Sequence, residues 1–471
     1  MPAKAATVYV HHLQTPHQTE PFTQFKPLSQ AMKEELFSAV AALFDAAGGA
    51  AMLKSSRDVF LKPNAIDSKP YCYTRSELVE AVIRYWKEAG ARHIYLFENC
   101  TQSNFTRMVF TLVGYSEICR RHGVREVYLD EEKSVPFTFH GKRPEYEEEG
   151  GYESTTFLIP KFVTENLIDK ADENLYISLP KLKTHSMAGV TLGVKNQWAF
   201  PQPSDRRQDH NYNLASKLAD MLGYLQPDFT IIEGIEASTF GHYIPTALAD
   251  KCILPFRVLV AGSNVVATDL VGARLFGLTP AEDAEHLRIV IERGYGRGVR
   301  SLDDVEIVGD ISDFTERYSW DLYQQFPEDV TIIKGTTRCC REGCQNNPLS
   351  VIQSLAYDFH GRGGWSIVMG KGHDPAVIEA IEGRVLVAGH CAIAEVGERL
   401  VARLGRKKVY FTGYCNDLCA TTTALCHLMD VNPLLMAPLP FFTAIKLLAL
   451  SKLHGSQANV PFFFAHKFKV V

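Results

Sequence analysis

The chain has 471 residues, of which 46% are hydrophobic and 22% are charged, values that are ordinary for a globular protein. This length is enough for two or three domains with a large core. The formal net charge of −5 gives no electrostatic basis for binding nucleic acid, so we expect no nucleic-acid partner.

The apolar segments and the number of cysteines indicate in which cellular compartment the protein is found. The N-terminal sequence passes directly into a strand-like segment and lacks the apolar stretch of a secretory signal. No segment offers the roughly 18 uninterrupted apolar residues that a membrane span needs. We therefore expect a cytoplasmic protein. Structural disulfides are rare there, so the eleven cysteines require another explanation.

Residues 1–325 are predicted to form one α/β domain, with a mostly parallel sheet flanked by helices. Short apolar strands alternate in this part of the chain with segments of helical periodicity. Thr74 or Ser76 is expected to cap the first of these helices. The strands are expected at residues 59–61, 93–97, 174–179, 228–232 and 257–261, and the helices at 77–89, 214–225 and 265–276.

A basic segment follows the predicted strand 174–179, and we interpret it as a loop. Lysine supplies a positive point charge, while threonine, asparagine and backbone N–H groups supply hydrogen bonds of defined direction. The pattern therefore predicts a site for a small phosphate or carboxylate; a solvated basic loop is the alternative. The residues assigned to this anion site are Lys62, Asn64, Lys181, Lys183, His185, Lys195 and Asn196.

Several of these residues belong to motifs that follow one another in a specific order. Leu61-Lys62-Pro63-Asn64, Pro180-Lys181-Leu182-Lys183-Thr184-His185 and Gly193-Val194-Lys195-Asn196 are continued by Ile231-Ile232-Glu233-Gly234 and by the segment 265–273. Over residues 55–300 this order resembles the family known as domain of unknown function 362. Its members are often labelled uncharacterised iron–sulfur centre proteins, so the resemblance implies a fold and a redox character.

The chain departs from this family in one respect. Family members often carry a C-terminal ferredoxin segment with tightly spaced cysteines that ends in Cys-Pro. No such segment occurs here, so a two-cluster electron path is not carried over from the resemblance. The family has no established reaction, and the chemistry must be sought in the residues themselves.

Residues 326–433 are predicted to form a second α/β domain, which carries most of the cysteines. Seven of the eleven lie between Cys339 and Cys426. In a parallel sheet the carboxyl ends of the strands share one edge, where ligands bind. We therefore expect these thiols to meet at one crevice. The strands are expected at 329–333, 365–369, 384–390 and 408–414, and the helices at 350–360, 375–382 and 393–404.

Three strand ends that each supply one cysteine would hold a [4Fe–4S] cluster with one open iron. The expected ligands are Cys340 or Cys344, then Cys391, then Cys415 or Cys419. Zinc is an alternative, which nearby His390 and His373 support. A further alternative is that the thiols are small buried hydrophobic groups, which we expect for Cys426.

Three ionisable residues flank the expected ligands, namely His390, Glu395 and Asp417. Each is a candidate for moving protons beside the cluster. Each also suits a structural role at a helix end or on the surface, and Asp417 in particular has the position of a helix N-cap.

We therefore expect an iron–sulfur enzyme that carries out a reduction or an elimination on a small anionic organic substrate, under anaerobic conditions. The alternative is a non-catalytic iron–sulfur or zinc carrier, or an electron-transfer protein. A ferredoxin-like electron donor and a homodimer are further expectations. The apolar tail, residues 434–471, is expected to pack on the body or on a second subunit rather than to contact a membrane.

Overall fold

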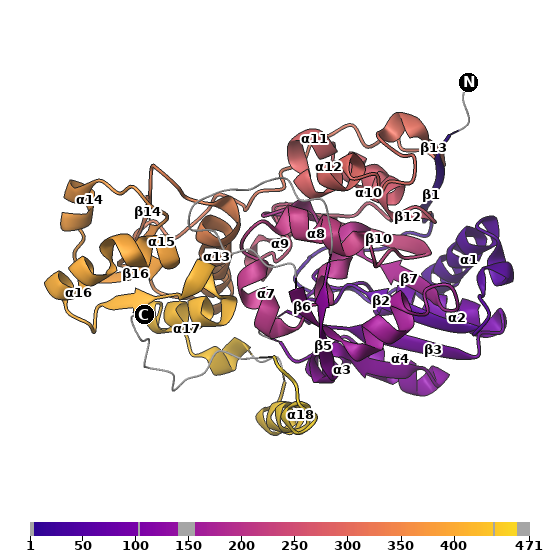
Figure 1. Ribbon diagram of the computed structural model, residues 1–471, viewed down its shortest axis with the longest axis horizontal. Coiled ribbons are helices and arrows are strands. Elements are labelled where there is room, and N and C mark those ends of the chain that lie inside the picture. The colour runs from indigo at the N-terminus through magenta and orange to yellow at the C-terminus, as the bar shows by residue number, and fades with distance from the viewer. Residues whose placement is uncertain (1–3, 102–103, 140–155, 437–438, 459–471) are drawn as a thin grey trace.

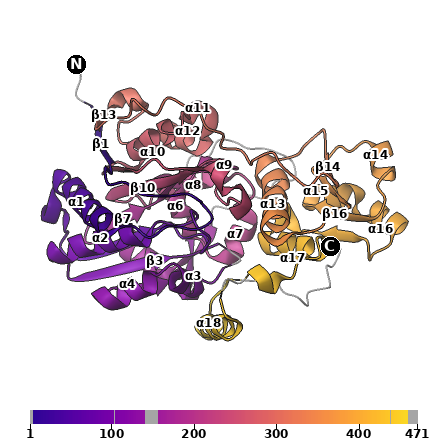
Figure 2. The ribbon, with the colours of Figure 1, turned by 180° about the vertical axis from the view of Figure 1, so that it is seen from behind.

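The strands of the protein form two large sheets that lie toward opposite ends of its longest axis (Figure 1). The computed structural model describes residues 4–101, 104–139, 156–436 and 439–458, without the side chains of 207–209. The view from behind shows the same separation of the two bodies (Figure 2). The predicted α/β class, with a mostly parallel sheet flanked by helices in each body, is confirmed.

The first sheet has the strand order β13-β1-β12-β10-β7-β2-β3-β4. Its centre is parallel, because β2 pairs in parallel with both β3 and β7, whereas β12 is antiparallel to β1 and β10. The strand bounds are β1 Ala6–His12, β2 Asp58–Pro63, β3 His93–Glu98, β4 Arg125–Tyr128, β7 Leu175–Leu179, β10 Phe229–Ser238, β12 Val258–Gly262 and β13 Val305–Val308. A separate antiparallel hairpin joins β5 Ser134–Thr138 and β6 Thr156–Pro160.

One segment differs from its prediction as a loop. Residues Lys181–His185 form a strand, β8, which pairs in parallel with β10 and in antiparallel with the short strand β9, Gly189–Val190. Alternate residues of a strand face opposite sides, and here Leu182 joins the apolar core while Lys181 and Lys183 are fully buried among polar groups. Inside the fold, Lys181 pairs with the Glu233 carboxylate and Lys183 donates to the Cys72 carbonyl oxygen.

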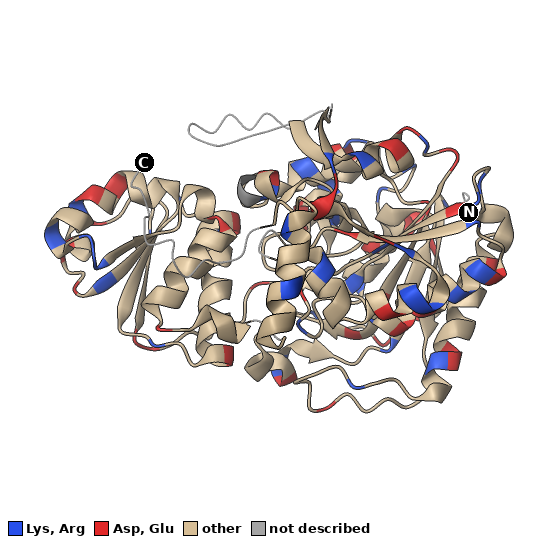
Figure 3. Ribbon diagram, turned by 90° about the horizontal axis from the view of Figure 1, so that it is seen from below, with Lys and Arg blue, Asp and Glu red and all other residues tan. Residues whose placement is uncertain are grey.

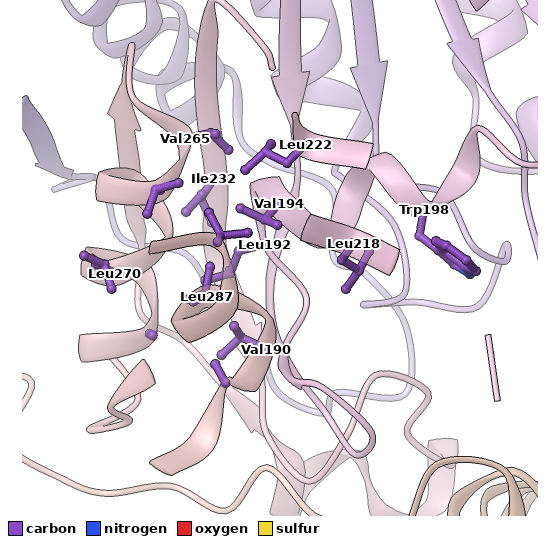
Figure 4. Packing of buried hydrophobic residues seen from close by; sticks show 14 of the residues in the cluster. Val190, Leu192, Val194, Trp198, Leu218, Leu222, Ile232, Val265, Leu270 and Leu287 are labelled. Atoms are coloured by element: carbon purple, nitrogen blue, oxygen red, sulfur yellow. The ribbon is translucent and has the colours of Figure 1, made fainter. Parts of the chain in front are cut away.

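Helices cover both faces of the first sheet, which therefore has two apolar cores. Neighbouring residues of β2 separate into these cores, Phe60 into one and Val59 and Leu61 into the other. Figure 4 shows part of the first core, where Val190, Leu192 and Val194 pack with Leu218 and Leu222. The helices are α1 Gln30–Ala46, α2 Ser76–Glu88, α3 Thr106–Leu112, α4 Tyr115–His122, α6 Gly193–Asn196, α7 Pro203–Asp209, α8 Leu214–Leu222, α10 Val265–Arg274 and α12 Glu285–Glu292.

The start of α2 corrects one local prediction. Its N-cap is Arg75, which makes no side-chain capping bond, and neither Thr74 nor Ser76 caps the helix. The Thr74 hydroxyl instead donates to the carbonyl oxygen of Leu179 at 2.5 Å and accepts the Asn64 N–H at 3.1 Å. Thr74 thus ties the end of β2 to the end of β7.

The second sheet has the order β14-β15-β16-β17, and all of its strands are parallel. Because the strands follow one another in the sheet as in the sequence, all their carboxyl ends share one edge. The strands are β14 Val330–Lys334, β15 Trp365–Met369, β16 Arg384–Ala388 and β17 Val409–Phe411, with helices α13 Asn347–Phe359, α14 Pro375–Glu379, α16 Glu398–Leu404 and α17 Leu418–Leu428.

The tail forms a helix, α18 Phe441–Leu453, that lies next to α3 at the rim of the first body (Figures 1 and 2). The Lys452 ammonium lies 5.3 Å from the Phe105 ring, and the Gln457 N–H donates to the Asp130 carbonyl oxygen at 2.9 Å. The rest of the predicted tail, 459–471, lies outside the described residues. Within the described residues, no helix has the length and hydropathy to cross a membrane.

Candidate functional site

Four cysteines line one pocket at the carboxyl edge of the second sheet. Cys340 and Cys344 follow β14, Cys391 follows β16 and Cys415 follows β17. The pocket is narrow: the space that the centre of a water molecule can reach is about 20 Å³, within about 410 Å³ that protein atoms leave unfilled and that is partly open to solvent. The other residues that line it are Asn211, Tyr212, Arg338, Gly343, His390 and Tyr414.

The local backbone holds the thiols in this arrangement. Cys344 lies within a π-helical turn, Arg341–Asn346, and Cys391 lies in the short helix His390–Ala392. Cys415 has a φ of 43°, in the left-handed region that non-glycine residues seldom occupy. Such backbone strain persists where surrounding contacts fix it, and it clusters at functional sites. Here the contacts come from the neighbouring Asn416, which is fully buried.

Asn416 ties three segments of the pocket together. Its side-chain Nδ2 donates to the Gly343 carbonyl oxygen at 2.6 Å, and its Oδ1 accepts the hydroxyl of Thr412. Its own backbone is also left-handed, with a φ of 60°. The turn after β17 is thus bonded directly to the turn after β14, which carries Cys344.

The thiols oppose one another's ionisation. Burial, followed by the nearby thiols of Cys391 and Cys340, raises the pKa of Cys415 to about 12. A hydrogen bond to Cys340, followed by burial, raises the pKa of Cys344 still further. The cationic Arg338 acts against this, because its Nε donates to the Cys340 sulfur at 3.3 Å. Full ionisation of the group would require additional positive charge, which a metal centre supplies.

The side chains around the pocket determine what kind of metal centre it could bind. All eleven cysteines are free thiols. Among the described residues, no group of three or more His, Cys, Asp or Glu side chains is arranged to hold a metal ion. The pocket does offer four thiols and an N–H donor to sulfur, the kinds of group that ligate and stabilise iron–sulfur clusters.

Three of the residues expected beside the cluster lie elsewhere than in the pocket lining. Cys419 is on α17 and does not line the pocket. The Glu395 carboxylate accepts from the backbone of Gly372 at 3.0 Å and contacts His373 Nδ1 at 2.6 Å. Asp417 caps α17 by accepting the Ala420 N–H. Of the proposed proton carriers, His390 lines the pocket, with its ring 5.3 Å from that of Tyr414.

Within the predicted anion site, some of the residues have structural partners. Lys62 contacts the Glu98 carboxylate at 2.8 Å, and Lys181 contacts both oxygens of Glu233 at 2.9 and 2.7 Å. Asn196 accepts from Lys62 and donates to the Ser178 hydroxyl. The Asn64 amide donates to Asn196, while its oxygen has no partner. These residues connect the ends of the central strands.

The remaining members, Lys183, His185 and Lys195, are buried without a carboxylate partner among the residues that the structure describes. Within that part of the chain Lys183 donates only to the Cys72 carbonyl oxygen, at 3.1 Å, and burial lowers its pKa to about 8. Burial, followed by the charges of Lys183 and Arg206, lowers the pKa of Lys195 to about 7. The His185 Nε2 is buried without a hydrogen-bond partner. This uncompensated group is suited to an anion.

Several residues near these lysines were not predicted as part of a site. The His242 ring stacks on that of His185 at 3.9 Å, and its Nδ1 is also buried without a partner. Arg206 donates to the carbonyl oxygens of Asn99 and Cys100, again without a carboxylate. These residues lie in separate polar segments, so neither spacing nor periodicity connects them with Lys183.

The segment 210–212 lies between the cysteine pocket and the buried lysines. Asn211 and Tyr212 line the pocket, and Asn211 Nδ2 donates to the Cys415 carbonyl oxygen at 2.9 Å. The ring of His210 lies 5.8 Å from that of His185. A second connection joins the Asn346 amide to the Ser186 carbonyl oxygen at 2.7 Å. The two predicted sites are therefore neighbours across the junction of the domains.

A larger polar pocket lies elsewhere, between α3, α4 and β4. It is lined by charged residues that pair with one another, such as Arg107 with Glu131 at 2.6 Å, and by Cys119, which belongs to the apolar core. Burial, followed by the charges of Glu131 and Glu165, raises the pKa of Glu132 in its lining.

Comparison with known proteins gives a resemblance to one family over part of the chain. No curated protein matches the chain. A crystal structure of a protein from Thermotoga maritima is similar over 85% of this chain and 83% of that chain, at 10% identity and a TM-score of 0.37. The model of one family matches residues 59–274. The resemblance indicated by the motifs is thereby confirmed: this part of the chain resembles the family described as Domain of unknown function (DUF362).

Proposed function

We propose that the protein is an iron–sulfur cluster enzyme that carries out a reduction or an elimination on a small anionic organic substrate. The observation that carries this proposal is the gathering of Cys340, Cys344, Cys391 and Cys415 around one pocket. A group of buried, uncompensated cations lies next to that pocket across residues 210–212. A redox or Lewis-acidic centre and an anion site side by side are what such chemistry requires.

The ligands in this proposal are Cys340 or Cys344, together with Cys391 and Cys415. When bound, a cluster with one open iron supplies electrons or polarises a substrate oxygen. Arg338 would stabilise the bound thiolates through its N–H donor to Cys340. Cys419 is retained only as a comparison, because it lies outside the pocket lining.

The other residues act on the substrate. Lys183 and Lys195 would attract its anionic group, and His185 Nε2 would donate to it. Their burial excludes water, which strengthens each of these interactions. His390, at the rim of the cysteine pocket, would transfer a proton to or from the reacting oxygen. Electrons would come from a ferredoxin-like donor in the cytoplasm.

The decisive experiment is anaerobic purification followed by iron and sulfide assays and by EPR spectroscopy after reduction. We expect about four irons and four sulfides per chain. Cys391→Ser and Cys415→Ser should lose most of this iron, whereas the matched control Cys419→Ser should keep it. A colourless, iron-free wild-type protein from such a preparation contradicts the proposal.

One observation favours a second candidate, a non-catalytic iron–sulfur carrier or electron-transfer protein. Four thiols rather than three line the pocket, and four ligands would saturate a cluster. The comparison of Cys340→Ser with Cys344→Ser separates the two. If either variant keeps a full cluster and small oxo or hydroxy acids shift its EPR signal, the enzyme is favoured. If both lose the cluster, the saturated carrier is favoured.

A further inference from the structure

We propose that Lys195 is a nucleophile that forms an imine with the carbonyl carbon of a small oxo acid. This inference rests on the proposed anion site and adds a substrate class to it: carboxylates that carry an aldehyde or ketone group. It assigns Lys195 a covalent role that differs from that of the neighbouring lysines.

The first argument is the fixed position of the lysine. Lys195 is on α6, whose first backbone N–H groups, those of Gly193 and Val194, donate to the buried Asp269 carboxylate at 2.7 and 2.8 Å. Val194 is anchored in the apolar core (Figure 4). A side chain at position 193 would meet Val265 at 2.5 Å, so the helix lies tightly against α10. The backbone that carries the amine therefore cannot shift far.

The second argument is the absence of a partner. Among the described residues, the Lys195 side chain makes no hydrogen bond or ion pair, although it is only 9% exposed. Lys62 and Lys181 are fully buried, and each contacts a glutamate. A buried ammonium without an anion is unfavourable, so Lys195 is the lysine of this group that is most readily neutral.

The third argument is the charge around the amine. The groups that act on Lys195 are Lys183, Arg206 and Lys62, all of them cations, and together with burial they lower its pKa to about 7. A lysine that is desolvated and placed beside another cation keeps its amine free at neutral pH, which is how imine-forming lysines are activated.

The fourth argument is a set of groups suited to the rest of such a substrate. The His185 Nδ1 accepts from the backbone of Met187 and Ala188, so in the neutral ring the proton lies on Nε2, which has no partner. The hydroxyls of Ser186 and Thr191 are likewise buried without partners. With Lys183, these groups would hold a carboxylate while the carbonyl carbon faces Lys195.

The reaction balances without any oxidant or reductant. The amine nitrogen forms a bond to the carbonyl carbon, and the carbonyl oxygen takes up a proton to become a hydroxyl. The nitrogen gives up its protons and the hydroxyl leaves as water, which yields a carbon–nitrogen double bond. His185 and His242, whose rings are stacked and whose pKa values burial lowers well below the ordinary range, stay neutral, so the protons pass from the amine nitrogen to the carbonyl oxygen rather than through an imidazolium.

The test uses the full-length protein, with pyruvate and 2-oxoglutarate as probes and sodium borohydride to reduce the imine. We expect a stable adduct, located at Lys195 by peptide mass spectrometry. Lys195→Arg keeps a long basic side chain but has no nucleophilic amine, so it should abolish the adduct; the exposed control Lys407→Arg should leave it unchanged. Lactate, which has no carbonyl group, should give no adduct.

The outcomes separate this inference from the proposed function. Trapping at Lys195 in protein without iron supports the imine and contradicts the cluster enzyme. A protein with a full cluster that shows no adduct, or one modified equally at its exposed lysines, overturns the inference and leaves the cluster proposal standing. Circular dichroism of Lys195→Arg shows whether a lost adduct reflects misfolding, and the wild-type adduct remains decisive in either case.

Discussion

At the scale of single residues, the buried lysines of the first body divide into those with and those without a carboxylate. Lys181 lies against Glu233, and both side chains are fully buried. Lys183, two residues later on the same strand, donates only to a carbonyl oxygen. The same residue type therefore serves the fold at one position and is available for a ligand at the next.

This difference predicts opposite effects of removing the two charges. Lys181→Met leaves the Glu233 carboxylate buried and unpaired, so we expect a loss of about 3–5 kcal/mol in the free energy of unfolding. Lys183→Met removes a cation that has no counter-charge, so the change should stay below about 1 kcal/mol. Urea denaturation followed by circular dichroism measures both. Equal losses in the two variants would contradict the assignment.

The pH dependence of stability gives a second prediction. Burial and neighbouring cations lower the pKa of Lys195 from 10.5 to about 7 in the folded protein. Between these values the unfolded chain binds more protons at this site, so its contribution to the free energy of unfolding rises with pH. Below the folded pKa the lysine is charged in both states, and the penalty for burying it is fully present.

Comparison with Lys195→Met isolates this contribution, because all other groups titrate in both proteins. The variant should be more stable than the wild type below pH 7, by an amount on the order of a few kcal/mol, and its advantage should shrink toward pH 10. Denaturation curves at a series of pH values test this. A difference that does not change with pH would show that Lys195 titrates normally.

Residue types in the sequence indicated basic chemistry at Lys183, His185 and Lys195, but not which lysines would be free. Glu98 and Glu233 are far from Lys62 and Lys181 in sequence, and only the parallel packing of β2, β3, β8 and β10 brings them together. Ion pairs between strand ends depend on which strands are neighbours in the sheet. The spacing of apolar residues predicts the strands but not their order in the sheet.

At the scale of elements, the gathering of thiols follows from the parallel second sheet. Apolar strands alternating with helices predict a shared carboxyl edge, and four of the cysteines that follow three of these strands line one pocket. The departure of Cys419 has a local reason. The left-handed turn at Cys415 and Asn416 intervenes before α17 begins, so the spacing of four residues is not helical.

The turn after β14 provides a third prediction. A Cβ at Gly343 would lie 2.7 Å from the Cys415 carbonyl oxygen and 2.9 Å from that of Asn211. Backbone atoms cannot move aside easily, so Gly343→Ala should separate the turns that carry Cys344 and Cys415. We expect the iron content of the anaerobic protein to fall severalfold while the far-UV circular dichroism is retained.

A matched control for this change is Ser350→Ala on α13, where one hydrogen bond within the helix is lost and no close contact arises. It should retain iron at the wild-type level. Full iron content in Gly343→Ala would show that the spacing of these two turns does not govern the cluster.

At the scale of the whole molecule, acidic and basic residues are interspersed over the ribbon (Figure 3), in keeping with the small net charge. The tail is the exception to this polar surface. Of the large hydrophobic side chains exposed among the described residues, most belong to the segment 434–453, with Phe442 84% and Leu453 83% exposed. Apolar groups gathered in this way favour association.

This surface gives the fourth prediction. Phe442→Ser combined with Leu453→Ser should lower the fluorescence of the dye ANS bound to the native protein and reduce any association seen at high concentration in sedimentation velocity. The thermal midpoint should stay within a few degrees of the wild type, because both residues are exposed. Unchanged dye binding would place the apolar surface elsewhere.

Asn211 and Tyr212, which belong to the first body, form one side of the cysteine pocket, and this affects how the protein matures. The thiols they face, from Cys340 onward, come later in the sequence and are therefore synthesised after Asn211 and Tyr212. The pocket is complete only when the last strand, β17, has joined its sheet and the two bodies have met. Under the proposed function, the cluster would be inserted only at this last step, and chains with misassembled bodies would stay without it.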